Sequence, residues 1–336
     1  MHSPANLSTF LADWRNFPHR LDFRSGRLLY LRVDAGTLES SAFLDGRTAL
    51  SVTGEEYVVE LEDALGCWSD TGCHQRPPLI LHTAFCGSTL LARMLTQPGR
   101  VVCLREPQIL ADIAAWHAAL PVERRKQTVP ALRFALAQLG RSLGGAAIAI
   151  KPTNWINPML PEMVDAGVER AVWLTSDLRT LLIAALRGGN DRIAYLSRYA
   201  VHAARSQSPL DSLIRQATVT GSSLEKALRL SALSLLAQQL SFAGIAPRFD
   251  EALHINFSAL IADPQTTAAR AAAALGLEGF AGDASLSASL QTHAKADGAF
   301  DGAREAAVNE DLFRRYGAEI LGAERWAKEV AAPQLA

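Results

Sequence analysis

Short apolar segments alternate with helical patterns along most of the chain, and this alternation constrains the fold more than any other feature. The apolar segments are residues 79–83, 101–104, 146–150, 170–175 and 253–257. Helical patterns follow several of them, for example over residues 109–120, 178–187 and 265–275. Strands that are apolar at every position are typical of a parallel sheet covered by helices on both faces. The sequence therefore predicts an α/β fold with three layers.

Residues 1–76 have a different pattern, from which we expect a small β-rich or mixed N-terminal element. RLLYLRV, at 27–33, predicts a strand, and EEYVVELEDAL, at 55–65, predicts a short strand or helix. Asp45-Gly46 lies between SSAFL and RTALSV, and such a dipeptide is a hairpin signal. Pro77-Pro78 then separates this element from an α/β domain over residues 77–336.

Composition limits the possible partners. A net charge of −1 over 336 residues lacks the basic field that nucleic-acid binding uses, so an anion site would be local. The most apolar long stretch, residues 227–246, contains Arg229, Gln238 and Gln239, which favours a buried helix over a membrane span. The N-terminus lacks the apolar run of a signal peptide, and four cysteines make no disulfide framework. We expect a cytoplasmic protein without a nucleic-acid partner, and its oligomeric state stays open.

The carboxyl ends of the predicted strands indicate where a ligand would bind. In open parallel sheets ligands bind beyond the carboxyl ends of the strands. Four polar segments follow predicted strands, and they are residues 82–89, 105–106, 151–154 and 175–179. They are far apart in the sequence, but a parallel topology would bring them to one edge of the sheet.

The first of these segments looks like a phosphate-binding loop that leads into a helix. Against the pattern G-x-x-x-x-G-K-[ST], Gly87 and Thr89 match, whereas His82 replaces the first glycine and Ser88 replaces the lysine. Main-chain N–H groups and a helix N-terminus can still bind an anion without an ammonium group. The hydroxyl groups of Ser88 and Thr89 could contact that anion or cap the helix. An ordinary strand–turn–helix explains the segment equally well.

Residues 84–95, AFCGSTLLARML, resemble the loop P-[RK]-S-G-T-T-L-L-A-x-x-L of sulfotransferases. That family binds the 5′-phosphosulfate of PAPS (3′-phosphoadenosine 5′-phosphosulfate) in this loop. Four further segments resemble family segments in the same order, and they are residues 104–110, 150–186, 255–277 and 290–303. The resemblance covers about residues 79–330. It implies a P-loop-type fold and metal-independent sulfuryl transfer from PAPS to a hydroxyl or amine of a small-molecule acceptor.

The resemblance also implies roles for individual residues. Glu106 would be the general base, and Lys151 would bind the transferring group. The nucleotide-binding positions would be Phe85, Cys86, Gly87, Ser88, Thr89, Ser176, Arg179 and Lys295. Three positions depart from the family pattern: Phe85 replaces a basic residue, and Ser176 and Ala184 replace the arginine and serine of the 3′-phosphate site. The cations that could substitute there are Arg179, Arg187, Arg192 and Lys295.

Other interpretations remain open at this point. Glu106 could instead pair with Arg105 or lie solvated in a loop, and Lys151 could be a surface lysine whose stem covers the sheet edge. Asp177 and Arg179 could pair with each other at a helix start. The spacing of Cys67, Cys73 and His74 matches no usual zinc pattern, so we expect no metal. At the level of function, the alternatives are a kinase-like phosphotransferase and a nucleotide-binding protein without catalytic activity.

Overall fold

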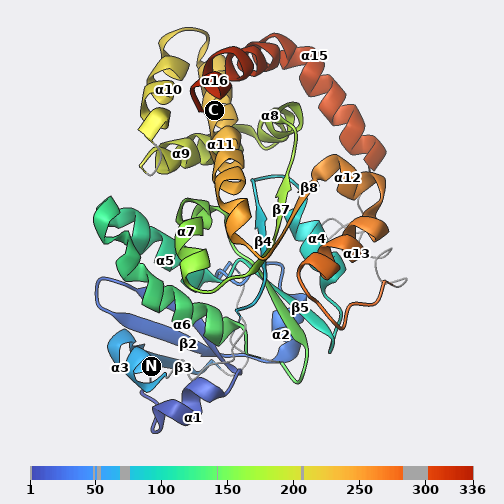
Figure 1. The fold of residues 1–336 in the computed structure, drawn as a ribbon. Coiled ribbons are helices and arrows are strands. Elements are labelled where there is room, and N and C mark those ends of the chain that lie inside the picture. The colour runs from blue at the N-terminus through green and yellow to red at the C-terminus, as the bar shows by residue number, and fades with distance from the viewer. Residues whose placement is uncertain are drawn as a thin grey trace.

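The computed structural model describes residues 2–47, 50, 54–68, 76–141, 143–205, 208–282 and 302–335. The prediction of an α/β fold is confirmed: a five-stranded parallel sheet in the order β5-β6-β4-β7-β8 forms the centre of the molecule (Figure 1). Its strands are β4 (Leu79–His82), β5 (Val101–Arg105), β6 (Ala147–Lys151), β7 (Arg170–Thr175) and β8 (Glu251–Asn256).

Helices cover both faces of this sheet. One face packs against α4 (Ser88–Leu95), α12 (Phe257–Ala262) and α13 (Pro264–Ala274). The other packs against α5 (Gln108–Ala119), α6 (Val129–Leu139) and α7 (Leu160–Asp165). Successive strand side chains point to opposite faces, so that Leu79 and Leu81 enter one core and Ile80 the other. Burial on both faces explains why the central positions of β4 to β7 are apolar, whereas the edge strand β8 is mostly half-buried or exposed and carries Glu251 and His254.

A group of helices gathers at the end of the molecule opposite the N-terminal sheet (Figure 1). These are α8 (Leu178–Arg187), α9 (Gly189–Ala204), α10 (Ser208–Val219), α11 (Ser223–Ile245), α15 (Gly302–Trp326) and α16 (Ala332–Leu335). Short segments of other helical types are η1 (Val122–Thr128), η2 (Asn154–Met159), η3 (Ala246–Arg248) and η4 (Ala327–Ala331). Only α11, among the helices described, is long and apolar enough to cross a membrane, and it packs against α9, α10 and α15.

The N-terminal element contains a three-stranded antiparallel sheet, β1 (Asn16–Asp22), β2 (Arg27–Arg32) and β3 (Glu56–Glu60). Its helices are α1 (Leu7–Ala12), α2 (Ala35–Ser40) and α3 (Leu61–Cys67). The strand expected at 27–33 is therefore present, and residues 55–65 form both a strand and the start of a helix. This sheet packs on α5 and α6, so the N-terminal element and the α/β domain contribute to one hydrophobic cluster.

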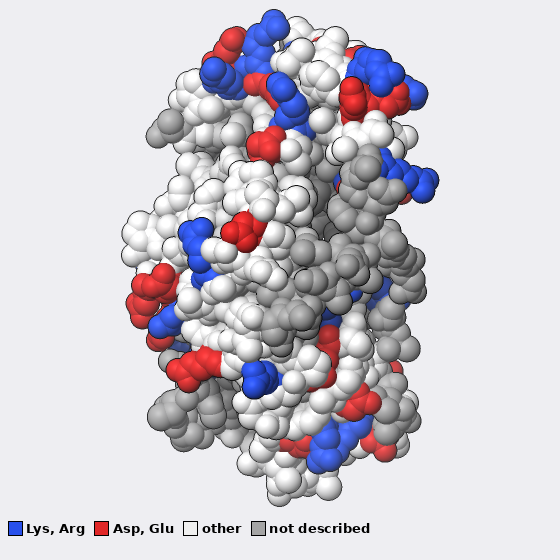
Figure 2. Space-filling model, turned by 90° about the vertical axis from the view of Figure 1, so that its right-hand side faces the viewer, with Lys and Arg blue, Asp and Glu red and all other residues white. Residues whose placement is uncertain are grey.

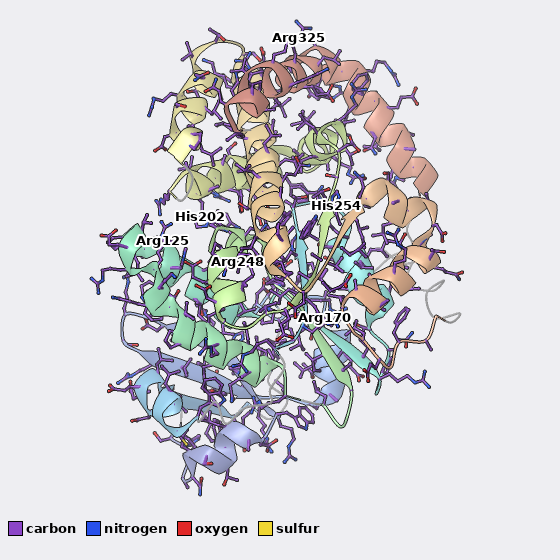
Figure 3. The ribbon with its side chains drawn as sticks, viewed as in Figure 1. Arg125, Arg170, His202, Arg248, His254 and Arg325 are labelled. Atoms are coloured by element: carbon purple, nitrogen blue, oxygen red, sulfur yellow. The ribbon has the colours of Figure 1, made fainter. Side chains whose placement is uncertain are left out.

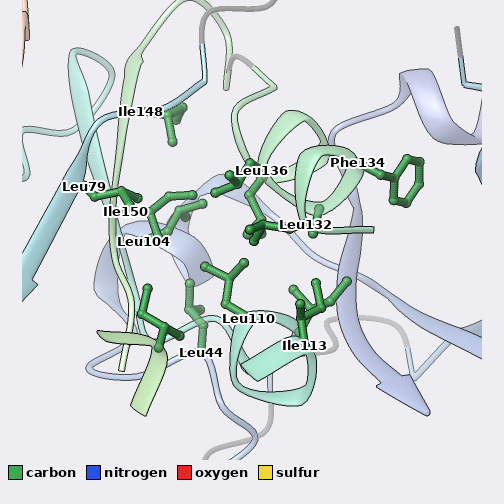
Figure 4. Packing of buried hydrophobic residues seen from close by; sticks show 14 of the residues in the cluster. Leu44, Leu79, Leu104, Leu110, Ile113, Leu132, Phe134, Leu136, Ile148 and Ile150 are labelled. Atoms are coloured by element: carbon green, nitrogen blue, oxygen red, sulfur yellow. The ribbon is translucent and has the colours of Figure 1, made fainter. Parts of the chain in front are cut away.

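The hairpin expected around Asp45-Gly46 is wrong. Residues 35–40 form α2, residues 41–47 bend without strand pairing, and residues 48–49 and 51–53 lie outside the description. Leu44, instead of pairing across a hairpin, is fully buried in the cluster that holds Leu104 and Leu110 (Figure 4). Burial of a leucine side chain in a core stabilises by about 1.5–3 kcal/mol, which outweighs a local turn preference.

Candidate functional site

The loop between β4 and α4 has a left-handed backbone at two positions. Phe85 has φ 59° and Gly87 has φ 78°. A Cβ atom on Gly87 would lie 2.7 Å from a ring carbon of Phe257 on α12, so this position requires glycine on both steric and backbone grounds. Phe85 and Glu106 are the two residues other than glycine with positive φ in the part of the chain that the structure describes. Strain of this kind gathers at functional sites.

The loop presents main-chain N–H groups at the start of α4. Gly87 is the N-cap, and neither Ser88 nor Thr89 caps the helix with its hydroxyl group, so the capping interpretation is wrong. No protein acceptor lies on the N–H groups of Gly87, Ser88 or Thr89 among the residues described. The thiol of Cys86 donates to the carbonyl of Thr83 at 2.9 Å, which closes the turn. Unpaired amides at a helix N-terminus favour an anion.

Glu106 and Lys151 meet at the ends of neighbouring strands. Parallel pairing of β5 with β6 aligns Arg105 with Lys151, which puts Glu106 directly beside the lysine. Lys151 Nζ lies 2.6 Å from Glu106 Oε1, and the Lys151 side chain is 1% exposed. The alternative of a surface lysine is therefore wrong. So is the pairing of Glu106 with Arg105, because that arginine donates to the carbonyl of Glu39 at 2.6 Å.

The N-terminal element holds the turn at Glu106. Leu44 N–H donates to the carbonyl of Arg105 at 2.7 Å, and its own carbonyl accepts from Gln108 N–H at 3.2 Å. Glu106 N–H donates to the carbonyl of Lys151 at 2.6 Å, which fixes the left-handed residue from the other side. Arg47 Nη2 lies 3.0 Å from Glu106 Oε2. No pattern in the sequence indicated this contact, because the segment of Leu44 and Arg47 resembles a hairpin.

Charge decides the protonation of this cluster. Burial alone would raise the pKa of Glu106, but the charge and the hydrogen bond of Lys151, with a smaller effect of Arg47, outweigh it and bring that pKa to about 2. Burial and then Lys151 lower the pKa of His82 to about 3, so its ring is neutral at pH 7. His82 lies between the loop and β6, with Nδ1 2.9 Å from the carbonyl of Thr83 and Nε2 3.0 Å from that of Pro152.

A buried network of amide side chains connects the loop after β4 to helices α9 and α11. Asn157 Nδ2 donates to the carbonyl of His82 at 3.1 Å and to Gln238 Oε1 at 2.9 Å. Asn154 Nδ2 donates to the same Gln238 oxygen at 3.0 Å, and the hydroxyl of Tyr195 donates to Asn154 Oδ1. All three amide side chains belong to residues that are 1% exposed. In the sequence Gln238 only interrupts an apolar stretch, whereas in the structure it fixes Asn154 and Asn157, which follow β6.

The segment after β7 is occupied by structural contacts. Asp177 caps α8 by accepting from Thr180 N–H at 2.9 Å, and Arg179 binds both carboxylate oxygens of Glu324 at 2.8 and 2.9 Å. Asp177 and Arg179 therefore do not pair with each other. Ser176 is 1% exposed. Thr175 Oγ1 lies 2.7 Å from Nε2 of His254, which β8 carries (Figure 3).

Some expected features lie outside the described residues, namely Lys295, Cys73 and His74. No cluster of three or more potential metal ligands occurs in the described ranges. On the face shown in Figure 2, acidic and basic side chains are interspersed, in agreement with the net charge of −1.

No protein-family model matches this sequence, and no curated protein shows significant similarity to it.

Proposed function

We propose that this protein is a sulfotransferase-like enzyme that binds PAPS and transfers its sulfuryl group to a hydroxyl or amine of a small-molecule acceptor. One observation carries the proposal. The two strained non-glycine residues of the described chain, Phe85 and Glu106, both follow strands of the same sheet, and Lys151 at the end of a third strand pairs with Glu106. Backbone strain persists only where surrounding contacts enforce it, and such residues cluster at ligand and active sites.

The strand order supports a P-loop-type site. After β4 the chain runs to β5, which lies on the β6 side of the sheet. After β6 it crosses β4 and runs to β7, in the opposite direction along the sheet. The connecting helices consequently cover opposite faces, with α4 in one core and α7 in the other. A crevice for ligands forms where neighbouring strands have such opposite connections. The loop at Gly87 and the residues after Lys151 border this point, joined through His82 and Pro152.

The loop at Gly87 offers donors for the anionic end of the nucleotide. The unpaired amides of Gly87, Ser88 and Thr89 form an anion cradle that any side chain at residue 87 would disturb. PAPS supplies a sulfuryl group on a phosphate leaving group. Transfer forms a bond from the acceptor oxygen or nitrogen to sulfur and breaks the bond from sulfur to the phosphate oxygen. In-line placement and positive charge promote such a reaction more than covalent catalysis does.

Glu106 and Lys151 would have separate roles in the transfer. Lys151 stabilises the negative charge that develops on the transferring group, and Glu106 accepts the proton of the acceptor. With Lys151 against it, Glu106 has a pKa of about 2 and is a weak base. When Lys151 turns towards the sulfuryl group, Glu106 loses its nearest positive charge and keeps that of Arg47, at 3.0 Å. Its pKa then rises, and the carboxylate becomes a stronger base as the reaction requires one.

Thermal unfolding with two nucleotides tests the ligand. Adenosine 3′,5′-bisphosphate should raise the melting temperature, because a ligand at 100 times its Kd stabilises by about 2.7 kcal/mol. ATP with Mg²⁺ should have little effect, since Ser88 stands where phosphotransferases of this type carry lysine. Stabilisation by ATP and Mg²⁺ alone would replace the proposal with the kinase-like alternative.

Glu106→Gln tests the chemistry, measured as nucleotide product released from PAPS with a panel of small alcohols and amines. We expect this variant to bind the bisphosphate and to lose at least about a hundredfold in transfer rate, the usual contribution of a general base. Unchanged transfer would exclude Glu106 as the base. Binding of the bisphosphate without transfer to any acceptor, even by the unaltered chain, would favour the non-catalytic alternative.

A further inference from the structure

Residues 43–47 of the N-terminal element form a clip that holds one guanidinium group in place. The main-chain N–H of Arg47 donates to Asp45 Oδ1 at 3.1 Å, and Arg47 Nε donates to Asp45 Oδ2 at 2.6 Å. The guanidinium carbon lies 3.5 Å from the centroid of the Phe43 ring, in a cation–π geometry. Although the Arg47 side chain is 53% exposed, contacts within its own segment therefore fix its position.

The same local arrangement occurs a second time in the N-terminal element, away from Glu106. The main-chain N–H of Arg15 donates to Asp13 Oδ1 at 3.1 Å, and Arg15 Nε donates to the same oxygen at 2.9 Å. The Arg15 side chain is 54% exposed, and among the residues described it pairs with no carboxylate other than that of Asp13. An arginine two residues after an aspartate thus forms this arrangement without a further partner. The additional contact of Arg47 with Glu106 is not required by the local geometry.

Main-chain hydrogen bonds attach the clip to the turn that carries Glu106. Leu44 N–H donates to the carbonyl of Arg105 at 2.7 Å, and Gln108 N–H donates to the carbonyl of Leu44 at 3.2 Å. These two bonds flank Glu106 in the sequence, so the clip and the turn are positioned together. Arg47 therefore contacts a carboxylate whose backbone is fixed by the same segment.

The two carboxylate oxygens of Glu106 face different partners. Oε1 lies 2.6 Å from Nζ of Lys151, whose side chain is 1% exposed. Oε2 lies 3.0 Å from Nη2 of Arg47, on the more exposed side of the carboxylate. In the transfer proposed above, Lys151 turns towards the sulfuryl group and frees Oε1, whereas the clip still holds Oε2. A carboxylate held at one oxygen keeps its orientation while the other oxygen becomes available.

Resting on the proposed function, our inference concerns a residue outside the α/β domain. We propose that Arg47 is a positioning residue that holds Oε2 of Glu106, so that Oε1 accepts the proton of the acceptor. The acceptor oxygen or nitrogen forms its bond to sulfur as its proton passes to Oε1. The phosphate oxygen leaves with the electron pair of the broken bond to sulfur. Arg47 contacts neither the acceptor nor the nucleotide, and through it the N-terminal element contributes to the chemistry.

Steady-state kinetics of transfer from PAPS to a panel of small alcohols and amines test this role. Arg47→Gln should lower kcat by about tenfold or more, because a carboxylate held at neither oxygen is seldom aligned, and misalignment can cost up to about a hundredfold. The KM for the acceptor should stay within about twofold of its original value, since Arg47 does not contact the acceptor. Arg15→Gln is the matched control, and it should change neither constant.

The pH profile of kcat separates the charge of Arg47 from its geometry. Loss of the charge should raise the pKa of Glu106, so the acidic limb should move to higher pH by about one unit or less. Arg47→Lys should restore the limb but only part of kcat, because an ammonium lacks the planar fork that contacts Asp45 and Glu106 together. Two further titratable groups act on Glu106: burial lowers the pKa of His82 to about 3 and raises that of Tyr195 to about 12, so neither titrates near pH 7.

Carbon-13 titration of the Glu106 carboxyl group, assigned with Glu106→Gln, measures the pair without nucleotide or acceptor. Arg47→Gln should raise the pKa of that carboxyl group, and an unchanged pKa would overturn the inference. An unchanged kcat in Arg47→Gln would also overturn it and leave the proposed function intact. A lower acceptor KM at unchanged kcat would show that the acceptor displaces Arg47 from Oε2, which equally contradicts the positioning role. If the pKa shift appears but the unaltered chain transfers to no acceptor, the proposed function fails, and the positioning role with it.

Discussion

The two left-handed turns of the site are supported in different ways. The loop at Phe85 is stabilised by elements of the α/β domain itself, through Gly87 against Phe257 and through the start of α4. The turn at Glu106 depends on a segment about 60 residues earlier, because Leu44 and Arg47 bind it from the N-terminal element. A local loop can be recognised as a motif, whereas a turn assembled by distant residues cannot. We expect the two turns to respond differently to substitution.

Lys151→Met should have the largest effect on the turn at Glu106. The substitution removes one partner of a buried ion pair, which typically costs about 3–5 kcal/mol, since the other charge stays buried. Urea unfolding of the variant at pH 7 measures this loss. The second substitution Glu106→Gln, made in the Lys151→Met background, should restore much of the stability. A double variant as unstable as Lys151→Met would mean that the lysine stabilises through packing alone.

Leu44→Ala tests whether the N-terminal element builds the turn or only stabilises the fold. Truncation of a fully buried leucine should cost about 2–5 kcal/mol in urea unfolding. Leu38→Ala is the matched control, because Leu38 is 2% exposed in the same cluster but makes no main-chain bond to the Glu106 turn. Both variants should lose stability, and only Leu44→Ala should also slow the proposed sulfuryl transfer, because the shortened side chain no longer anchors the main-chain bonds between residue 44 and the turn. Equal transfer rates would make the element a purely structural support.

Gly87→Ala tests the loop after β4 through its effects on stability and on ligand binding. An alanine at φ 78° carries backbone strain, and its Cβ would lie 2.7 Å from the Phe257 ring. Left-handed strain costs about 1–3 kcal/mol, so we expect the free energy of unfolding to fall by that amount and binding of the proposed ligand, adenosine 3′,5′-bisphosphate, to weaken. Phe257→Ala, added to Gly87→Ala, should remove the steric clash and restore part of the binding. If the single variant binds the bisphosphate normally, the amides of this turn do not hold the ligand.

The difference between local motifs and contacts of distant residues also explains which features the sequence predicted and which it did not. Strands β4 to β7 were identified because their central residues are apolar and buried, and Glu106 and Lys151 because they stand at the ends of two of these strands. Contacts between distant segments could not be predicted. Arg179 meets a carboxylate 145 residues later, and Arg192 reaches Phe85 because Gly188 leaves space. Such contacts depend on how helices pack on each other, which local patterns do not encode. Leu44 is a further example, since its burial against distant residues prevailed over the local hairpin signal.

Arg47→Gln should have the smallest effect on the free energy of unfolding, and this effect should depend on pH. The folded protein lowers the pKa of Glu106 from its ordinary 4.5 to about 2, so the ionised carboxylate stabilises the fold. That contribution is complete above about pH 4.5 and disappears as the pH falls through 2. Without Arg47 the folded pKa moves up towards 4.5, and the contribution shrinks. Because the Arg47 side chain is 53% exposed, solvent screening limits the loss to about 1 kcal/mol or less.

Urea unfolding between pH 3 and 7 measures this difference. The stability gap between the unaltered chain and Arg47→Gln should be constant above about pH 5 and narrow below it, as Glu106 becomes protonated in the unfolded chain. In the Glu106→Gln background the gap should lose the part of its pH dependence that Glu106 contributes, while the carboxylate of Asp45 remains paired with Arg47. A gap of the same size at every pH would mean that Arg47 stabilises the fold through the uncharged Phe43 ring and not through Glu106. The turn at Glu106 would then depend on the N-terminal element for its main-chain geometry, through Leu44, and not for its charge.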